Sequence, residues 1–459
     1  MVIPKTALFF TFFLSSLEAF GQVNPVFKSL RFEDDFKKFQ ESKPISSYEQ
    51  LKYINFGEKS KGWMSVGGEF RFQYQFFTNE LWGVLEDDPD GFILFRNLVH
   101  FNISNGKNLR FFGQIKNNTI QSRIHPIRSI DQNILGLHQF FAEWDTQILG
   151  IPTFVRVGRQ EASLGAQRLI ATREGPNNRL SFDGIRAGIR SDFLDIDLLY
   201  YHPVLETPGI FDGRFNFESR VYGFYLVRHL NPSKKGADLY FLRVENDLAV
   251  FDPERGPEKR NSVGTRIFGE LNRFSGDLEF IYQWGRFNEG SISAYTISTN
   301  INYRSSIHDK RLIFGLKTEI ISGNKNLDDD VLGTFNPLYP MGAYFGLAAL
   351  IGPSNLIDIH PSIQFFPWKN FRLNVDYDIF WRHSTNDGIY GPNVRPIFSG
   401  VNAQERYIGS QLGMFVNYYF QPHFTITLEH TYFQSGDFLK EVSPGKNLNF
   451  TALTIQFKY

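Results

Sequence analysis

Residues 448–459, LNFTALTIQFKY, decide the fold of this chain. Two sets of side chains alternate along the stretch: the apolar Leu453, Ile455, Phe457 and Tyr459, and the polar Thr454, Gln456 and Lys458. Alternate side chains of a β-strand point to opposite faces, so this strand has one apolar face and one polar face. The same alternation recurs along almost the whole chain, more often than one soluble core could use. It therefore predicts a closed transmembrane β-barrel with lipid outside and water inside.

The composition agrees with a sheet exposed to two solvents. Aromatic residues make up 16% of the 459 residues, including 49 Phe and 20 Tyr, yet the mean hydropathy is −0.27. The formal net charge is zero, which argues against nucleic-acid binding as a property of the whole chain. Cysteine is absent, so an exported chain of this kind would have no disulfides to stabilise it.

The N-terminal residues have the features of a secretory signal peptide. Lys5 supplies a positive charge, residues 7–17 form an apolar run, and Ala19-Phe20-Gly21 is a plausible cleavage site. We expect a signal peptide at 1–21, a periplasmic N-terminal extension at 22–62 and the barrel at 63–459. The period of two begins abruptly at Trp63 and is clear in GEFRFQYQFF, residues 68–77.

Eighteen segments have the pattern of antiparallel strands: 63–77, 91–104, 109–117, 138–145, 153–160, 182–190, 193–201, 219–229, 238–246, 262–271, 276–286, 293–304, 311–321, 356–366, 371–382, 408–420, 423–433 and 448–459. Most are near the length of about 9–11 residues that a tilted strand needs to cross a bilayer. Short and long connections alternate, as expected for periplasmic turns and external loops. A soluble propeller would also have many strands, but we find no periodic blade motif. The parity of the connections places both termini in the periplasm, and we expect the barrel to lie in the bacterial outer membrane.

The alternation also predicts which charged side chains face the lumen: Arg71, Arg96, His100, Arg110, Lys116, Arg186, Arg190, Lys317, Glu319, Arg372, Asp376 and Arg382. The densest basic cluster lies within residues 156–190. It contains seven arginines (Arg156, Arg159, Arg168, Arg173, Arg179, Arg186 and Arg190) and three acidic residues, a surplus of four positive charges. Arginine binds carboxylates through a two-pronged planar fork, so the surplus favours an anionic solute. Alternatively, these arginines pair with acidic residues of the lumen and stiffen the wall.

Other motifs are weaker. The acidic turns at 87–90 (DDPD) and 328–330 (DDD) could hold a divalent cation, but the first lacks the spaced ligands and terminal Glu of a calcium loop, so we favour solvated turns. The ten histidines show no metal-ligand spacing, and we find no nucleophile elbow, P-loop or dinucleotide motif. We therefore expect no cofactor, no bound metal and no enzymatic activity.

Three blocks of the sequence resemble the alginate-export family of outer-membrane porins. The first runs from LKYI at 51–54 through WMSVGGE at 63–69. The second comprises RVGRQE at 156–161, QRL at 167–169, REGPN at 173–177, SFDG at 181–184 and Arg186. The third comprises TFNPLYP at 334–340 and NLIDIHP at 355–361.

The resemblance implies an 18-stranded barrel whose arginine-rich constriction passes an anionic polysaccharide outward. It makes six arginines candidates for the constriction or its loops: Arg156, Arg159, Arg168, Arg173, Arg179 and Arg186. Strict alternation from Arg156 would turn Arg159 toward the lipid unless a bulge intervenes. Arg71, Arg96, Arg190 and Lys317 complete the predicted pore lining.

The main hypothesis is a passive pore through which hydrophilic, anionic solutes diffuse, since residues 22–62 are too few for an energy-coupling plug domain. The alternative pore hypothesis is dedicated export of a uronate polysaccharide such as alginate, handed over by periplasmic partners. Two further alternatives are a barrel-borne enzyme and a structural barrel plugged by its own loops. The expected partners are outer-membrane lipid and the anionic solute, and not nucleic acid.

Overall fold

A computed structural model of the chain describes residues 27–36, 39, 47–56, 61–231, 235–420 and 422–459. The predicted signal peptide at 1–21 lies outside these residues. So does much of the predicted extension at 22–62.

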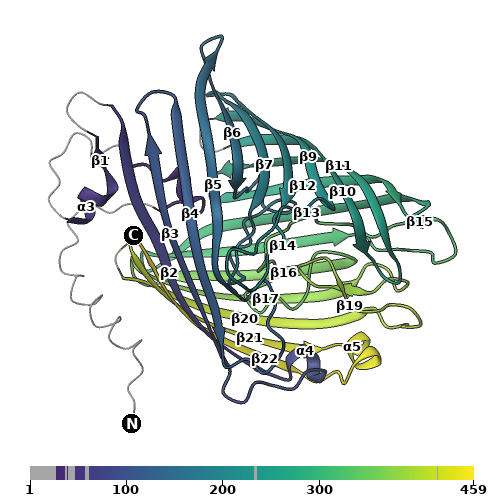
Figure 1. Cartoon of the computed structure of the whole chain (residues 1–459). Coiled ribbons are helices and arrows are strands. Elements are labelled where there is room, and N and C mark those ends of the chain that lie inside the picture. The colour runs from purple at the N-terminus through teal and green to yellow at the C-terminus, as the bar shows by residue number, and fades with distance from the viewer. Residues whose placement is uncertain (1–26, 37–38, 40–46, 57–60, 232–234, 421) are drawn as a thin grey trace.

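Most of the described residues belong to one large sheet, antiparallel throughout its wall, that closes into a barrel (Figure 1). The sheet contains 20 strands, of which β1 (Ile54–Asn55) and β15 (Val331–Leu332) have two residues each. The other strands form the wall of an 18-stranded barrel, which confirms the predicted fold class. They are β2 (Trp63–Thr78), β3 (Phe92–Ser104), β4 (Leu109–Gln121), β5 (Asn133–Ile148), β6 (Ile151–Gln160), β7 (Phe182–Arg190), β8 (Leu194–Pro203), β9 (Ser219–Asn231), β10 (Lys235–Val250), β11 (Arg255–Leu271), β12 (Phe274–Phe287), β13 (Gly290–Ile307), β14 (Lys310–Ile321), β16 (Leu356–Phe366), β17 (Phe371–Arg382), β20 (Tyr407–Phe420), β21 (Phe424–Ser435) and β22 (Leu448–Lys458).

The first and last strands of the wall close the ring. β2 pairs antiparallel with β22, with Glu69 opposite Lys458 and Phe72 opposite Ile455. Every other wall strand pairs with its neighbours in chain order, so no wall edge is left open among the described residues. Closure satisfies the backbone hydrogen-bonding groups of every strand, which a bilayer requires.

The two ends of the barrel differ in their connections. The short-turn end carries connections such as 105–108, 149–150 and 308–309. The long-loop end carries 79–91, 122–132, 161–181, 204–218, 322–355, 383–406 and 436–447. The small elements α4 (Glu80–Gly83), α5 (Asp437–Val442) and the hairpin of β18 (Ile389–Tyr390) and β19 (Pro396–Phe398) lie in these long loops, at the end opposite the C-terminus (Figure 1).

The wall has the two faces that the alternation predicts. Val99 and Val157 point outward and are each 50% exposed, whereas the adjacent His100 and Arg156 point inward and are 2% and 5% exposed. Similar apolar residues cover the outside of the other strands, among them Ile115, Phe140, Ile185, Leu239, Ile267, Leu278 and Ile363. Among the described residues, no helix combines the length and the apolar character needed to span a bilayer.

Several strands are longer than the alternation predicts, among them β4, β5 and β13, and β11 has the largest extension at one end. β10 and β11 were expected at 238–246 and 262–271, but they extend to Val250 and back to Arg255, and residues 251–254 connect them. The polar stretch RGPEKRN at 255–261 hid this extension. Where a strand extends beyond the hydrocarbon layer of the membrane, its outer face does not need apolar residues. The alternation of apolar and polar residues then disappears, although the backbone pairing continues.

The N-terminal residues pack against the inner wall near the short-turn end. The one-turn 3-10 helix η2 (Arg31–Glu33) places the Phe32 ring edge-on to Phe112 and Phe141, with centroids 5.9 and 5.3 Å away. Arg31 donates hydrogen bonds to the carbonyl oxygens of Gly68 (2.8 Å) and Tyr459 (3.0 Å). The short helix α3 (Ser47–Lys52) follows, and the Lys52 Nζ donates to the Val66 carbonyl oxygen at 2.7 Å.

Candidate functional site: the lumen constriction

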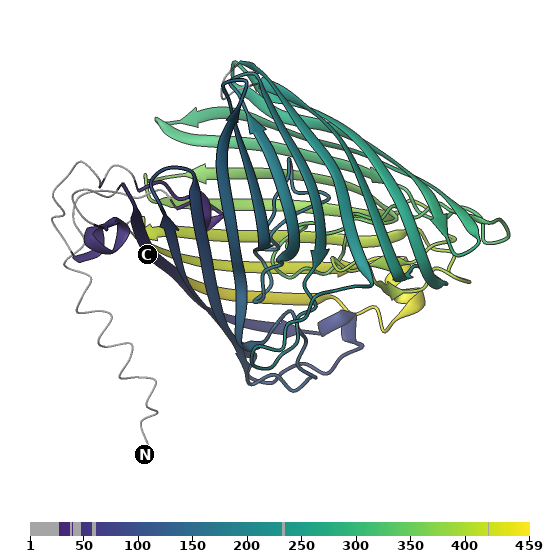
Figure 2. The same cartoon turned by 45° about the horizontal axis from the view of Figure 1, so that its top comes forward.

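Two of the long loops fold into the barrel and narrow its lumen (Figure 2). We call residues 161–181 and 322–355 the inward loops. Their apolar residues Leu169, Ile170, Phe335 and Leu338 are buried in one cluster with inward-facing residues of the wall. The loops also pair with each other: the Tyr339 N–H donates to the Leu169 carbonyl oxygen (2.8 Å), and the Tyr339 carbonyl oxygen accepts from the Ala171 N–H (3.0 Å). This contact between the inward loops lies inside the barrel, and we take it as the candidate functional site.

Most of the predicted lumen arginines are paired with carboxylates. Arg156 binds Glu143 and stacks over the Phe32 ring, 4.1 Å from its centroid. The remaining pairs are Arg96 with Glu69 and Glu174, Arg168 with Asp277, Glu279 and Glu319, Arg179 with Glu161 and Glu174, and Arg186 and Arg190 with Asp197. These guanidinium groups brace the wall and anchor the inward loops to it. Most arginines of the basic cluster at 156–190 therefore pair with acidic residues, as the alternative hypothesis from the sequence proposed.

Arg71 and Lys317 hold the inward loops in a different way. Arg71 donates to the carbonyl oxygens of Glu174, Gly175 and Pro176 at 3.1–3.2 Å, and so supports the tip of loop 161–181. Lys317 pairs with Glu319 at 3.2 Å, and its ammonium lies 4.1 Å from the centroid of the Tyr344 ring in loop 322–355. Both side chains face the lumen, as the alternation predicts.

Arg159 lies on the other side of the wall. It forms a two-pronged ion pair with Asp183 at 2.8 Å, next to the outward-facing Phe140. The structure therefore does not bring Arg159 together with the lumen arginines. The reason is the strict alternation from Arg156, with no bulge between the two residues.

Arg173 is the exception among the cluster. It lies where the inward loops meet, and its Nε donates only to the Pro340 carbonyl oxygen at 3.3 Å. It forms no ion pair with any acidic residue that the structure describes. Burial lowers the pKa of Arg173 to about 10, so the guanidinium is still charged at neutral pH.

A cavity of about 570 Å³ opens next to Arg173, between the inward loops and the other loops of the long-loop end. Its polar lining includes Arg128, Asp131, Arg173 and Glu206. Most of the lining is apolar and comes from Phe77, Leu85, Phe92, Leu94, Ile130, Leu180, Leu347, Leu350 and Ile397. A cavity of this size and character fits a small molecule that combines an apolar body with a negative group.

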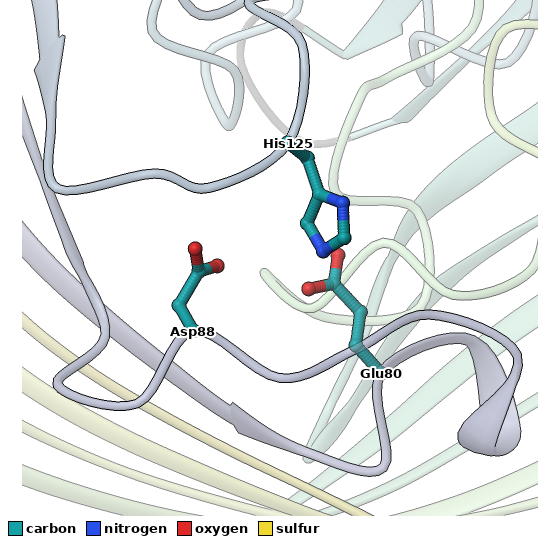
Figure 3. Close-up of side chains that lie close together, drawn as sticks. All are labelled: Glu80, Asp88 and His125. Carbon is teal, nitrogen blue, oxygen red and sulfur yellow. The ribbon is translucent and has the colours of Figure 1, made fainter.

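A group of possible metal ligands at the rim is already neutralised. Glu80, Asp88 and His125 point toward one another from the loops 79–91 and 122–132 (Figure 3). Arg123, however, donates to both oxygens of Glu80 (2.6 and 2.7 Å) and also pairs with Asp88. A guanidinium thus supplies the positive charge that a cation would bring. The neighbouring Asp87 caps the backbone N–H groups of Asn79 and Glu80 at 2.8 Å, which explains the acidic turn at 87–90 without a metal.

Sequence reasoning missed one group of lumen residues. Asp358 and His360 of β16 and Asp378 of β17 lie within reach of one another on the lumen face, and the structure places Asp376 beside them. The available signal was the i, i+2 spacing of D-x-H at 358–360 and D-x-D at 376–378. Such spacing puts both members of each pair on one face of a strand.

Comparison with known proteins identifies the kind of barrel. The family model described as alginate export matches residues 62–451. The crystal structure of Pseudomonas aeruginosa OccD3 (OpdP) is similar in fold, with a TM-score of 0.60 and 10% sequence identity, and the match covers 89% of this chain and 93% of that one.

Two other Pseudomonas aeruginosa outer-membrane proteins are similar to this chain. OpdO has a TM-score of 0.55 and 10% identity, covering 86% of this chain and 97% of its own. OpdK with vanillate also has a TM-score of 0.55 and 10% identity, covering 86% and 98%. No curated protein matches this chain in sequence. The match to the family model over most of the chain, together with the closed barrel, shows that this protein belongs to the alginate export family and is a porin-like β-barrel of the bacterial outer membrane.

Proposed function

We propose that this barrel is a passive pore for small organic anions, and that Arg173 is the residue that favours anions at the constriction. The observation that carries the proposal is the state of Arg173: a charged guanidinium at the contact between the inward loops, with no carboxylate partner among the described residues. An unpaired arginine in a narrow, partly apolar passage attracts anions because little water is present to screen it.

The lining of the cavity narrows the class of solute. Apolar side chains surround Arg173 on the long-loop side, so a carboxylate attached to an aromatic or aliphatic body would fit better than a fully hydrated ion. The fold neighbour OpdK has been crystallised with vanillate, an aromatic carboxylate, which agrees with this solute class. In this proposal the long-loop end faces outward and the short-turn end faces the periplasm, as is usual for outer-membrane barrels.

The second candidate is export of an anionic polysaccharide, which the family description favours. A polymer would need the inward loops to separate, because the backbone hydrogen bonds between Tyr339 and residues 169–171 cross its path. The two candidates thus differ in whether solutes pass while the inward loops remain in contact or only after the loops separate.

Single-channel recording in planar bilayers tests the proposal. In a KCl gradient the wild-type protein should conduct and its reversal potential should show anion selectivity. Arg173→Gln should shift the reversal potential toward cation selectivity, because it removes a positive charge that has no acidic partner among the described residues. Arg159→Gln is the matched control: it removes an arginine of the same cluster that lies on the outer face, and selectivity should not change.

Solute block separates the two candidates. Benzoate added to the long-loop side should interrupt the open-channel current in the wild type and much less in Arg173→Gln. An oligouronate that blocks equally well in both variants would favour the polysaccharide alternative. Absence of any conductance, or a selectivity that Arg173→Gln leaves unchanged, would contradict the proposal.

A further inference from the structure

The lumen wall opposite the arginine cluster carries a second group of charges, and this group is acidic. Glu319 of β14 lies opposite Asp358 of β16 in the strand register, and Lys317 lies opposite His360. Asp376 and Asp378 come from the next strand, β17. All of these side chains face the lumen beneath residues 344–347 of the inward loop, where Tyr344 donates a hydrogen bond to Glu319 at 2.8 Å.

Asp358 is the unusual member of this group. Its side chain is 1% exposed, and neither carboxylate oxygen has a hydrogen-bond partner in the structure. It forms no ion pair with a described basic residue. A buried carboxylate without a donor is costly, and in native proteins such a group usually indicates a missing proton, water or ion.

The neighbouring bases are committed to other partners. Lys317 pairs with Glu319 at 3.2 Å and lies over the aromatic rings of Tyr344 and Phe345. Arg168 pairs with Asp277 and Glu279. The situation differs from that of Glu80, Asp88 and His125 at the rim, where Arg123 occupies the carboxylates (Figure 3).

Two further ligand atoms point toward Asp358. The Nδ1 atom of His360 lies 2.5 Å from Oδ1 of Asp378, and one ligand atom from each of Asp358, His360 and Asp378 lies within 4.8 Å of the others. The other oxygen of Asp378, Oδ2, accepts a hydrogen bond from Gln411 at 3.0 Å, and Gln411 also donates to the Phe345 carbonyl oxygen at 2.7 Å. Gln411 therefore orients Asp378 as outer-shell partners orient metal ligands, and it leaves Oδ1 on the side of His360, where both atoms could coordinate one ion.

We propose that Asp358, His360 and Asp378 bind one divalent transition-metal ion, such as Zn²⁺ or Mn²⁺, in the wall of the lumen. Two carboxylates and one imidazole form a mixed oxygen and nitrogen ligand set, which suits these ions better than Ca²⁺. The site is reached from the lumen on the side of His360 and Asp376, whose side chains are 18% and 14% exposed. Three protein ligands leave a coordination position for water or a solute group from the lumen. The site does not depend on the anion-pore proposal, because it involves neither Arg173 nor its cavity.

The test uses Mn²⁺ as the probe with the full mature barrel, purified in detergent. Titration followed by electron paramagnetic resonance should show one Mn²⁺ bound per chain, and Zn²⁺ should displace it. Asp358→Asn and Asp378→Asn should each weaken Mn²⁺ binding by at least about tenfold. Spin-echo modulation from a coordinated nitrogen should appear in the wild type and disappear in His360→Gln.

Matched controls come from the rim group. His125→Gln and Asp88→Asn change the same residue types at a site where Arg123 already satisfies the carboxylates, so Mn²⁺ binding should not change. A shift in mobility on heating in detergent gels verifies that each variant is a folded barrel. If Asp358→Asn does not fold, His360→Gln provides the decisive measurement. Absence of stoichiometric Mn²⁺ binding, or binding that neither Asp358→Asn nor His360→Gln weakens, would overturn the proposal. Bound protons would then be what neutralises these carboxylates.

Discussion

At the scale of single residues, arginines of one cluster have different physical roles. Arg168 is surrounded by the carboxylates of Asp277, Glu279 and Glu319, whereas Arg173 contacts only a carbonyl oxygen. Arg168 neutralises carboxylates that would be costly to bury without a partner. For Arg173, we propose that its guanidinium is available to a solute.

This difference predicts opposite effects on stability. Arg168→Gln leaves three carboxylates of the wall without their shared partner, and breaking a buried pair in this way costs about 3–5 kcal/mol. Arg173→Gln removes a charge that has no partner, so its effect should stay below about 1 kcal/mol. Urea unfolding of the two variants in detergent, followed by the loss of the folded band on unheated gels, measures the difference. Equal losses of stability would contradict the distinct roles.

The sequence reveals the arginine surplus but not the pairing. The partners Asp277 and Glu279 follow Arg168 by 109 and 111 residues, so no local pattern connects them. Only the three-dimensional arrangement of the inward loop brings them together. By contrast, the proximity of Asp358 and His360 could have been predicted from the sequence, because residues spaced i, i+2 on a strand lie on the same face.

At the scale of secondary-structure elements, the strands were predictable wherever lipid covers them. All eighteen expected strands are present, because a membrane demands an apolar residue at every second position. The prediction failed at the ends of several strands, β10 and β11 among them, where the strands extend beyond the lipid and lose this constraint. The course of the loops was not predictable, since their positions depend on contacts such as that between Leu169 and Tyr339.

The helix α3 provides a prediction about pH. Burial lowers the pKa of Lys52 to about 7, with Arg31 contributing in the same direction, while the released amine titrates near its ordinary value. Between these two pKa values the released state binds a proton that the docked state lacks, so docking of α3 should strengthen as the pH rises from about 7 to 10. One pKa unit corresponds to about 1.4 kcal/mol, so the effect is measurable.

Hydrogen exchange of residues 47–52, corrected for the intrinsic rate at each pH, measures this docking. Protection should increase by at least about tenfold between pH 7 and pH 10. Lys52→Met should abolish the dependence, whereas Lys61→Met, at an exposed lysine nearby, should preserve it. Protection that falls with rising pH would show that the buried amine is charged when docked.

At the scale of the whole molecule, the fold rests on a single closure between β2 and β22. Phe72 and Ile455 face each other across it, and the next strand in the same row contributes Ile426. The chain contains no cysteine, so introduced thiols can be followed without interference.

A disulfide therefore tests the closure and its register. The double variant Phe72→Cys with Ile455→Cys should form an intramolecular disulfide on oxidation of the folded barrel, because facing residues of neighbouring strands lie within bridging distance. Phe72→Cys with Ile426→Cys is the control, since two strand spacings of about 4.8 Å each exceed that distance. Non-reducing gels with thiol labelling distinguish the two, and a bridge in the control alone would refute the register.

The hydrogen bonds of Arg31 have a consequence for how the molecule is assembled. Its guanidinium joins the Gly68 carbonyl oxygen, on the first strand, to that of Tyr459, the final residue of the chain. These two acceptors come side by side only after the last strand has found the first. Arg31 can therefore form both hydrogen bonds only once β22 has paired with β2, so we expect docking of this N-terminal segment to be a late step that follows closure of the ring.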